Sequence, residues 1–80
     1  MLSALTGANK VVGAKQVLRA IAAGGVSRVF VASDADVFVT RPVFDTCRAA
    51  GIEVTEVPSM KALGEACGVQ VKAAAAAIRR

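Results

Sequence analysis

The pattern that decides the fold lies in residues 12–25, which read VGAKQVLRAIAAGG. It predicts a helix over Ala14–Ala23, because apolar residues recur at helical spacing and the two closing glycines suit a helix C-terminus. Successive helical residues turn by about 100°, so Lys15, Gln16 and Arg19 fall within about 100° of one another. The opposite side of the same helical wheel is wholly apolar and is formed by Ala14, Val17, Leu18 and Ile21. One face of this helix should therefore pack into a core while the other stays polar.

The segments on either side of this helix alternate between strand and helix patterns. A helix is expected within residues 2–8, and a second over Thr40–Ala50 with Pro42 in its first turn. Ser59 is expected to cap the helix that follows it. The predicted strands are Lys10–Val12, Arg28–Ala32, Ile52–Val57 and a short buried strand in the alanine run Ala73–Ala77. This alternation predicts an α/β fold, a three-layer α/β/α sandwich with a roughly four-stranded mixed sheet, formed by residues 1–80 as a single domain.

The composition narrows the class of partner. Ten basic and six acidic residues give a formal net charge of +4, and a basic surplus on a small domain favours polyanions. The absence of Trp and Tyr argues against a protein that stacks single-stranded bases on aromatic side chains. No apolar run is long enough to span a bilayer, and the start of the sequence lacks the order of a secretory signal. We therefore expect a cytoplasmic protein that does not bind membranes.

The two cysteines, Cys47 and Cys67, are expected to be buried free thiols. They lack CxxC spacing, and the chain contains no His to complete a metal site. The sequence thus predicts no metal and no cofactor.

The polar face of the first helix has a chemistry that suits a nucleic-acid groove. Lys15 and Arg19 can donate to guanine O6 and N7, and the amide of Gln16 can both donate and accept. Gly13 directly precedes the first turn, where a missing side chain lets an anion approach unpaired N–H groups. Two plainer interpretations stay open: the face is ordinary solvated helix surface, and Gly13 only relieves backbone strain.

The segment from Val12 to Arg19 resembles the RNA-gripping segment of the kink-turn-binding ribosomal protein family. This family includes an archaeal large-subunit protein and small bacterial homologues of the YlxQ and YbxF type. The resemblance continues in order along the chain through residues 29–34, 51–54, 59–64 and 66–71, which read VFVASD, GIEV, SMKALG and ACGVQV. It covers nearly the whole chain from Lys10 onward and implies a non-enzymatic protein that binds structured RNA.

A kink-turn is an RNA duplex bent sharply at a short bulge and flanked by sheared G·A pairs. The resemblance implies that one group of contacts grips these pairs, and that the loop after the third helix covers a base extruded from the bulge. The implied RNA-binding residues are Gly13, Ala14, Lys15, Gln16, Arg19, Val69, Gln70, Val71 and Lys72. Val71 has an equal alternative as part of a strand that enters the core. The sequence does not distinguish ribosomal RNA from a riboswitch or another kinked element.

The chain also departs from the archaeal pattern. That pattern has Glu where Ser33 stands, Pro where Val37 and Lys72 stand, and an acidic residue where Gln16 stands. Because an acidic acceptor for guanine N–H groups is lost, the affinity for RNA is expected to be lower than in archaeal members.

Two competing functions deserve comparison. An apolar strand followed by Asp34-Ala35-Asp36 resembles the loop of Mg²⁺-dependent phosphatases, which use paired carboxylates at this point. The plainer interpretation is that Asp34 and Asp36 accept hydrogen bonds from neighbouring backbone N–H groups. The second competitor is a protein-interaction module of the same fold that does not bind RNA. In either binding role we expect a monomer.

Overall fold

The computed structural model describes residues 9–69 and 71–79 of the 80-residue chain, so the helix expected within residues 2–8 lies outside the described part. Strands and helices alternate, as the sequence predicts. In chain order they are β1 (Lys10–Val12), α1 (Ala14–Ala22), β2 (Val26–Ala32), α2 (Val37–Ala50), β3 (Val54–Val57), α3 (Met60–Ala66) and β4 (Ala75–Arg79).

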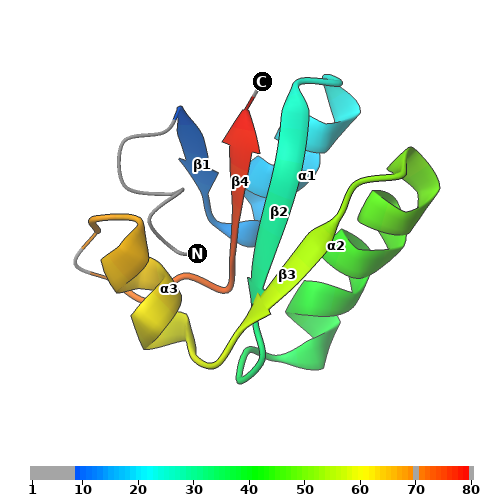
Figure 1. The fold of residues 1–80 in the computed structure, drawn as a ribbon. Helices are drawn as coiled ribbons and strands as arrows, with labels where there is room; N and C mark the ends of the chain where they lie inside the picture. Colours follow the sequence, from blue (N-terminus) through cyan, green and yellow to red (C-terminus); the bar gives the residue numbers. More distant parts are fainter. Residues whose placement is uncertain (1–8, 70, 80) are drawn as a thin grey trace.

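The four strands form one mixed sheet in the order β1-β4-β2-β3. Strand β4 lies antiparallel to both β1 and β2, whereas β2 and β3 run parallel, connected through α2. Helices α1 and α2 cover one face of the sheet and α3 covers the other (Figure 1). The predicted three-layer α/β/α sandwich is therefore confirmed. In the described residues, no helix has the length and apolarity needed to cross a membrane.

Strand β2 divides its side chains between two cores. Val29 and Val31 point into the core beneath α1 and α2, whereas Phe30 and Ala32 point toward α3. Successive side chains of a strand alternate between faces, so a strand covered on both sides is apolar at every position. This explains why residues 29–32 are all buried.

The alanine run forms the centre of the sheet. Ala75, Ala76 and Ala77 are completely buried, and β4 pairs on both of its edges. Alanine favours a helix when isolated, but tertiary context overrides such weak preferences. With only methyl groups at Ala75, Ala76 and Ala77, helices can approach this part of β4 closely from both faces. The strand predicted within Ala73–Ala77 exists, displaced by two residues.

Helix α2 begins earlier than predicted, at Val37 rather than Thr40. The reason is Asp36, whose carboxylate accepts a hydrogen bond from the N–H of Phe38 (2.9 Å) and caps the helix. Pro42 therefore lies within the helix rather than in its first turn, which corrects the sequence-based expectation. Because proline has no N–H, it donates nothing to the carbonyl of Phe38.

Candidate nucleic-acid interface

Four segments that are distant in sequence meet at one end of the sheet, the lower end in Figure 1. The N–H of Gly13, at the start of α1, donates to the carbonyl of Ala75 at the start of β4 (2.9 Å). The loop after β2 reaches the start of α3, where the N–H of Met60 donates to Oδ1 of Asp34 (2.7 Å). The start of β4, which follows the loop that contains Val71, therefore lies beside the start of α1.

The predicted polar face of α1 is present. Lys15, Gln16 and Arg19 are exposed, while Ala14 is half-buried and packs against the core. The buried side of the helix consists of Val17, Ala20 and Ile21. Because α1 packs into the core through its apolar side, its three long polar side chains are free to contact another molecule.

Gly13 is the N-cap of α1 and has φ +104° and ψ +142°, a conformation that residues with a Cβ rarely adopt. No side chain caps this helix. Among the described residues, a Cβ added at residue 13 would meet only Cγ of Gln16, at 4.0 Å. The positive φ shows that the backbone of residue 13 favours glycine, and the approach of an anion to the first turn stays a prediction.

The loop after α3 presents Val71 and Lys72 to solvent, and Val71 is 69% exposed. The alternative that Val71 belongs to a strand entering the core is therefore wrong, because β4 begins only at Ala75. Gln70 lies outside the described residues. A hollow of about 480 Å³ is lined by Lys61, Glu65, Val69, Val71 and Lys72.

Gly64 determines where this loop lies. A Cβ at residue 64 would stand 2.2 Å from the carbonyl oxygen of Val71 and 3.2 Å from its carbonyl carbon. No side chain fits between these two backbones, so a glycine in α3 is what allows the loop to pack so closely. The sequence alone gives no sign of this contact between Gly64 and Val71.

The acidic loop after β2 accepts hydrogen bonds from the starts of two helices. Asp36 caps α2, and Asp34 receives the N–H of Met60 at the start of α3. The interpretation that these carboxylates accept neighbouring backbone N–H groups is confirmed for Asp36, whereas the donor to Asp34 is a backbone N–H from another helix. Within the described residues, no cluster of three or more His, Cys, Asp or Glu side chains could hold a metal ion.

Comparison with known proteins identifies the family. Residues 2–80 match the family described as ribosomal protein L7Ae/L30e/S12e/Gadd45. The chain belongs to this family. The family to which the sequence motifs point is therefore confirmed.

Proteins similar to this chain are found among curated sequences and among solved structures. The RNA-binding protein YbxF of Geobacillus stearothermophilus is 47% identical over 70 residues, covering 88% of this chain and 85% of that protein. The solved structure of a protein of unknown function from Bacillus halodurans has a TM-score of 0.88 at 28% identity and covers 99% of this chain and 83% of that one. The 15.5kD RNA binding protein of Giardia lamblia has a TM-score of 0.85 at 29% identity, covering 99% and 65%.

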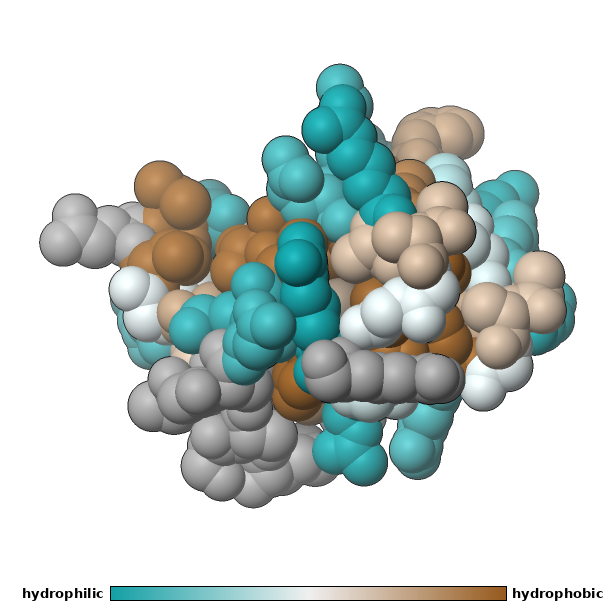
Figure 2. Space-filling view, turned by 90° about the horizontal axis from the view of Figure 1, so that it is seen from above, coloured by the Kyte–Doolittle hydropathy of each residue, from teal (hydrophilic) through white to brown (hydrophobic). Residues whose placement is uncertain are grey.

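The sequence gives no signal for two further residues. Arg79 lines a hollow of about 270 Å³ together with Gln16 and Arg19, which adds a third cation to the α1 face. In the view from above in Figure 2, long hydrophilic side chains project beside apolar atoms. Phe38 is 86% exposed, which corrects the expectation that no aromatic side chain is available for stacking.

The cysteines are buried free thiols, as predicted. Burial raises the pKa of both thiols, and for Cys67 the positive charge of Lys10 lowers it in part. A raised pKa reduces the thiolate fraction and with it the reactivity. Neither thiol takes part in the candidate interface.

Proposed function

We propose that this protein binds structured RNA, with kink-turn elements and their sheared G·A pairs as the target. The α1 face with Gly13, Ala14, Lys15, Gln16 and Arg19 enters the opened groove. The loop with Val69, Val71 and Lys72, and Gln70 beside them, contacts the base extruded from the bulge. The observation that supports this most is the meeting of an exposed polar helix face, an uncapped helix start and an exposed apolar loop at one end of the sheet.

The chemistry of the α1 face suits guanine edges and phosphates. Lys15 and Arg19 donate to O6 and N7, while Gln16 supplies both a donor and an acceptor. The positive end of the α1 dipole and the free N–H groups of its first turn favour a phosphate close to Gly13. These contacts need no metal and no cofactor, and they are binding contacts rather than catalytic ones.

The exposed Val71 suits the face of an unstacked base. Its side chain is apolar, lies in a loop and borders a hollow with Lys72. A base extruded from a bulge exposes a flat apolar surface, and covering it removes that surface from water. We propose that one protein monomer acts on one RNA element in the cytoplasm, in association with ribosomal RNA.

The α1 face is tested by removing one cation at a time. Lys15→Ala and Arg19→Ala should each weaken binding to a kink-turn RNA by about 1–3 kcal/mol, the usual contribution of a base-edge contact. Because both side chains are exposed, the midpoint of thermal unfolding should not move. Arg28→Ala is the matched control: it removes the same charge from β2, where Arg28 forms a surface ion pair with Glu53 (3.6 Å). If Lys15→Ala and Arg19→Ala bind as tightly as the parent, the proposed site is wrong.

Preference for RNA shape is tested by straightening the RNA. Side chains cannot enter the narrow major groove of regular A-form RNA but can enter a groove opened by a bend. Binding to a kink-turn should therefore be much tighter than binding to the same hairpin with its bulge deleted or its G·A pairs replaced by Watson–Crick pairs. Measurements near physiological salt suppress non-specific attraction. Equal affinity for bent and straight RNA would leave a non-specific basic domain.

A further inference from the structure

The start of α2 carries an exposed apolar patch that the proposed RNA grip does not use. Val37, Phe38 and Val39 are 56%, 86% and 40% exposed, three successive apolar residues in the first turn of a helix. The hydrogen bond from the N–H of Phe38 to Asp36 holds the backbone of this turn in place. Phe38 is thus an aromatic side chain presented to solvent on an anchored backbone.

Phe38 and Lys15 hold equivalent places on neighbouring helices. Lys15 lies two residues before Val17, the first buried residue of α1, and Phe38 lies two residues before Thr40, the first buried residue of α2. Two residues correspond to about 200° of helix rotation, so both side chains project away from the sheet. The two helices pack side by side on the same face and start at the same end of the sheet. Packed helices are separated by about 8–10 Å between their axes, so Phe38 and the proposed grip lie on neighbouring helices of the same layer.

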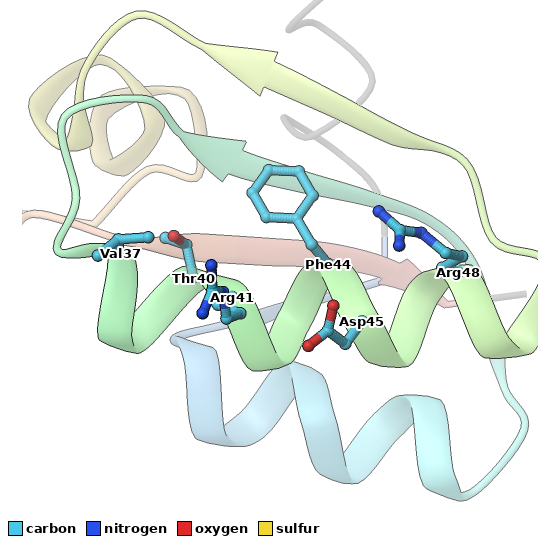
Figure 3. Close-up of a pocket in the computed structure, with 6 residues that line it drawn as sticks. All are labelled: Val37, Thr40, Arg41, Phe44, Asp45 and Arg48. Atoms are coloured by element: carbon cyan, nitrogen blue, oxygen red, sulfur yellow. The ribbon is translucent and has the colours of Figure 1, made fainter.

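A hollow begins at Val37, the residue before Phe38, and continues along α2. It has a volume of about 510 Å³, and Figure 3 shows its side chains following the helix. They are Val37, Thr40, Arg41, Phe44, Asp45 and Arg48. No ion pair joins Arg41 to Asp45 among the described residues, so the guanidinium remains available to a phosphate. Arg41 follows Phe38 by three residues and therefore lies on the same side of the helix.

We propose that Phe38 and Arg41 form a second contact for single-stranded RNA next to the kink-turn grip, with a base stacked on the Phe38 ring and its phosphate paired with Arg41. An aromatic ring beside a cation is the combination by which proteins hold unpaired nucleotides without reading their sequence. The proposal rests on the proposed function, because it takes the RNA to be held already by α1. A second protein copy is a poorer occupant: stable dimers cover about 800 Å² on each partner, far more than one helical turn offers.

The contact is tested with two RNAs, a minimal kink-turn and the same kink-turn with a short unpaired tail at its 5′ or 3′ end. The tail carries 2-aminopurine, whose fluorescence falls when the base stacks. The parent protein should bind one tailed RNA more tightly than the minimal RNA and quench the fluorophore. Phe38→Ala should bind that tailed RNA about 5- to 100-fold more weakly and quench little, while its affinity for the minimal RNA stays that of the parent. Arg41→Ala should lower the salt dependence by about one phosphate contact.

Two further variants distinguish stacking on the Phe38 ring from a general apolar contact, and the second contact from the α1 grip. Phe38→Leu keeps an apolar side chain and should recover little of the quenching, because stacking needs the ring. Lys15→Ala should weaken both RNAs equally. If neither tail gains affinity or quenching while Lys15→Ala still weakens binding, the second contact is wrong and the α1 grip stands. If Lys15→Ala has no effect on either RNA, the proposed function itself fails. A change in sedimentation of Phe38→Ala without RNA would show a protein interface instead and overturn the proposal.

Discussion

The starts of α1 and α3 lie at the same end of the sheet and are built in opposite ways. The N-terminus of α3 is capped by side chains of the protein: Oγ of Ser59 accepts the N–H of Ala62 (3.0 Å), and Oδ1 of Asp34 accepts the N–H of Met60 (2.7 Å). Helix α1 starts at Gly13, has no side-chain cap, and leaves open space where a Cβ would stand. At the start of α3, side chains of the protein accept two of the first N–H groups, whereas no side chain among the described residues does so at the start of α1.

This difference between the two helix starts suggests that residues around α3 stabilise the fold, whereas residues on the α1 face serve binding. Contacts around α3 hold its helix, the loop after β2 and the loop with Val71 together. The exposed face of α1 contributes little to the core, so substitutions on this face can change ligand affinity without changing the packing of the protein. Substitutions around α3 should therefore change the free energy of unfolding, and those on the α1 face should change affinity.

The largest effect is expected at Gly64. Gly64→Ala places a Cβ against the carbonyl of Val71, so helix or loop must move, and we expect a loss of about 3 kcal/mol in the free energy of unfolding. Urea denaturation measures it. Gly25→Ala is the matched control, because Gly25 has no positive φ and no atom within 4 Å of an added Cβ. Equal stability of the two variants would mean that the loop does not pack on α3 as described.

A smaller loss is expected at Gly13. Gly13→Ala forces a residue with a Cβ to keep φ near +104°, which costs about 1–3 kcal/mol. The variant should still fold, because an added Cβ meets no atom closer than 4.0 Å. Circular dichroism during thermal unfolding, beside an RNA titration, separates stability from binding. A variant as stable as Gly25→Ala would contradict the strained conformation of residue 13.

The smallest effect is expected at Asp34. Asp34→Ala removes the acceptor for the N–H of Met60 and should cost about 1 kcal/mol, the typical worth of a helix cap. Asp34→Asn should recover part of this loss, since its amide oxygen can accept the same bond. Asp45→Ala, which removes a carboxylate from the exposed side of α2, is the control for charge. If Asp34→Ala unfolds at the same urea concentration as Asp45→Ala, the carboxylate does not support α3.

The sequence alone predicts the alternation of strands and helices, the two sides of α1 and the cap at Ser59. Each of these depends on residues a few positions apart. A helical wheel places Lys15 and Val17 on opposite sides whatever the rest of the chain does. The alanine strand was also predicted, because apolar residues flank the run, although its ends were displaced.

Features that join distant residues were not predictable in the same way. Asp34 was recognised as a backbone acceptor, but its donor at Met60 lies in another helix. The contact of Gly64 with Val71 and the exposure of Phe38 depend on how helices sit on the sheet. The start of α2 differs from the expectation for a local reason: proline in a first turn favours a start at Thr40, whereas Asp36 caps the helix at Val37.

The central position of β4 also sets the order in which the chain folds. Helix α2 connects β2 to its parallel neighbour β3, so this unit can form from residues close in sequence. Among the described strands, β1 pairs with β4 alone, and Lys10 lies opposite Ile78. A nascent chain on a ribosome that has not yet reached Ala75 therefore lacks this partner of β1. Because such distant pairings are slow to close, we expect the hydrogen bond from Gly13 to Ala75 to form late in folding.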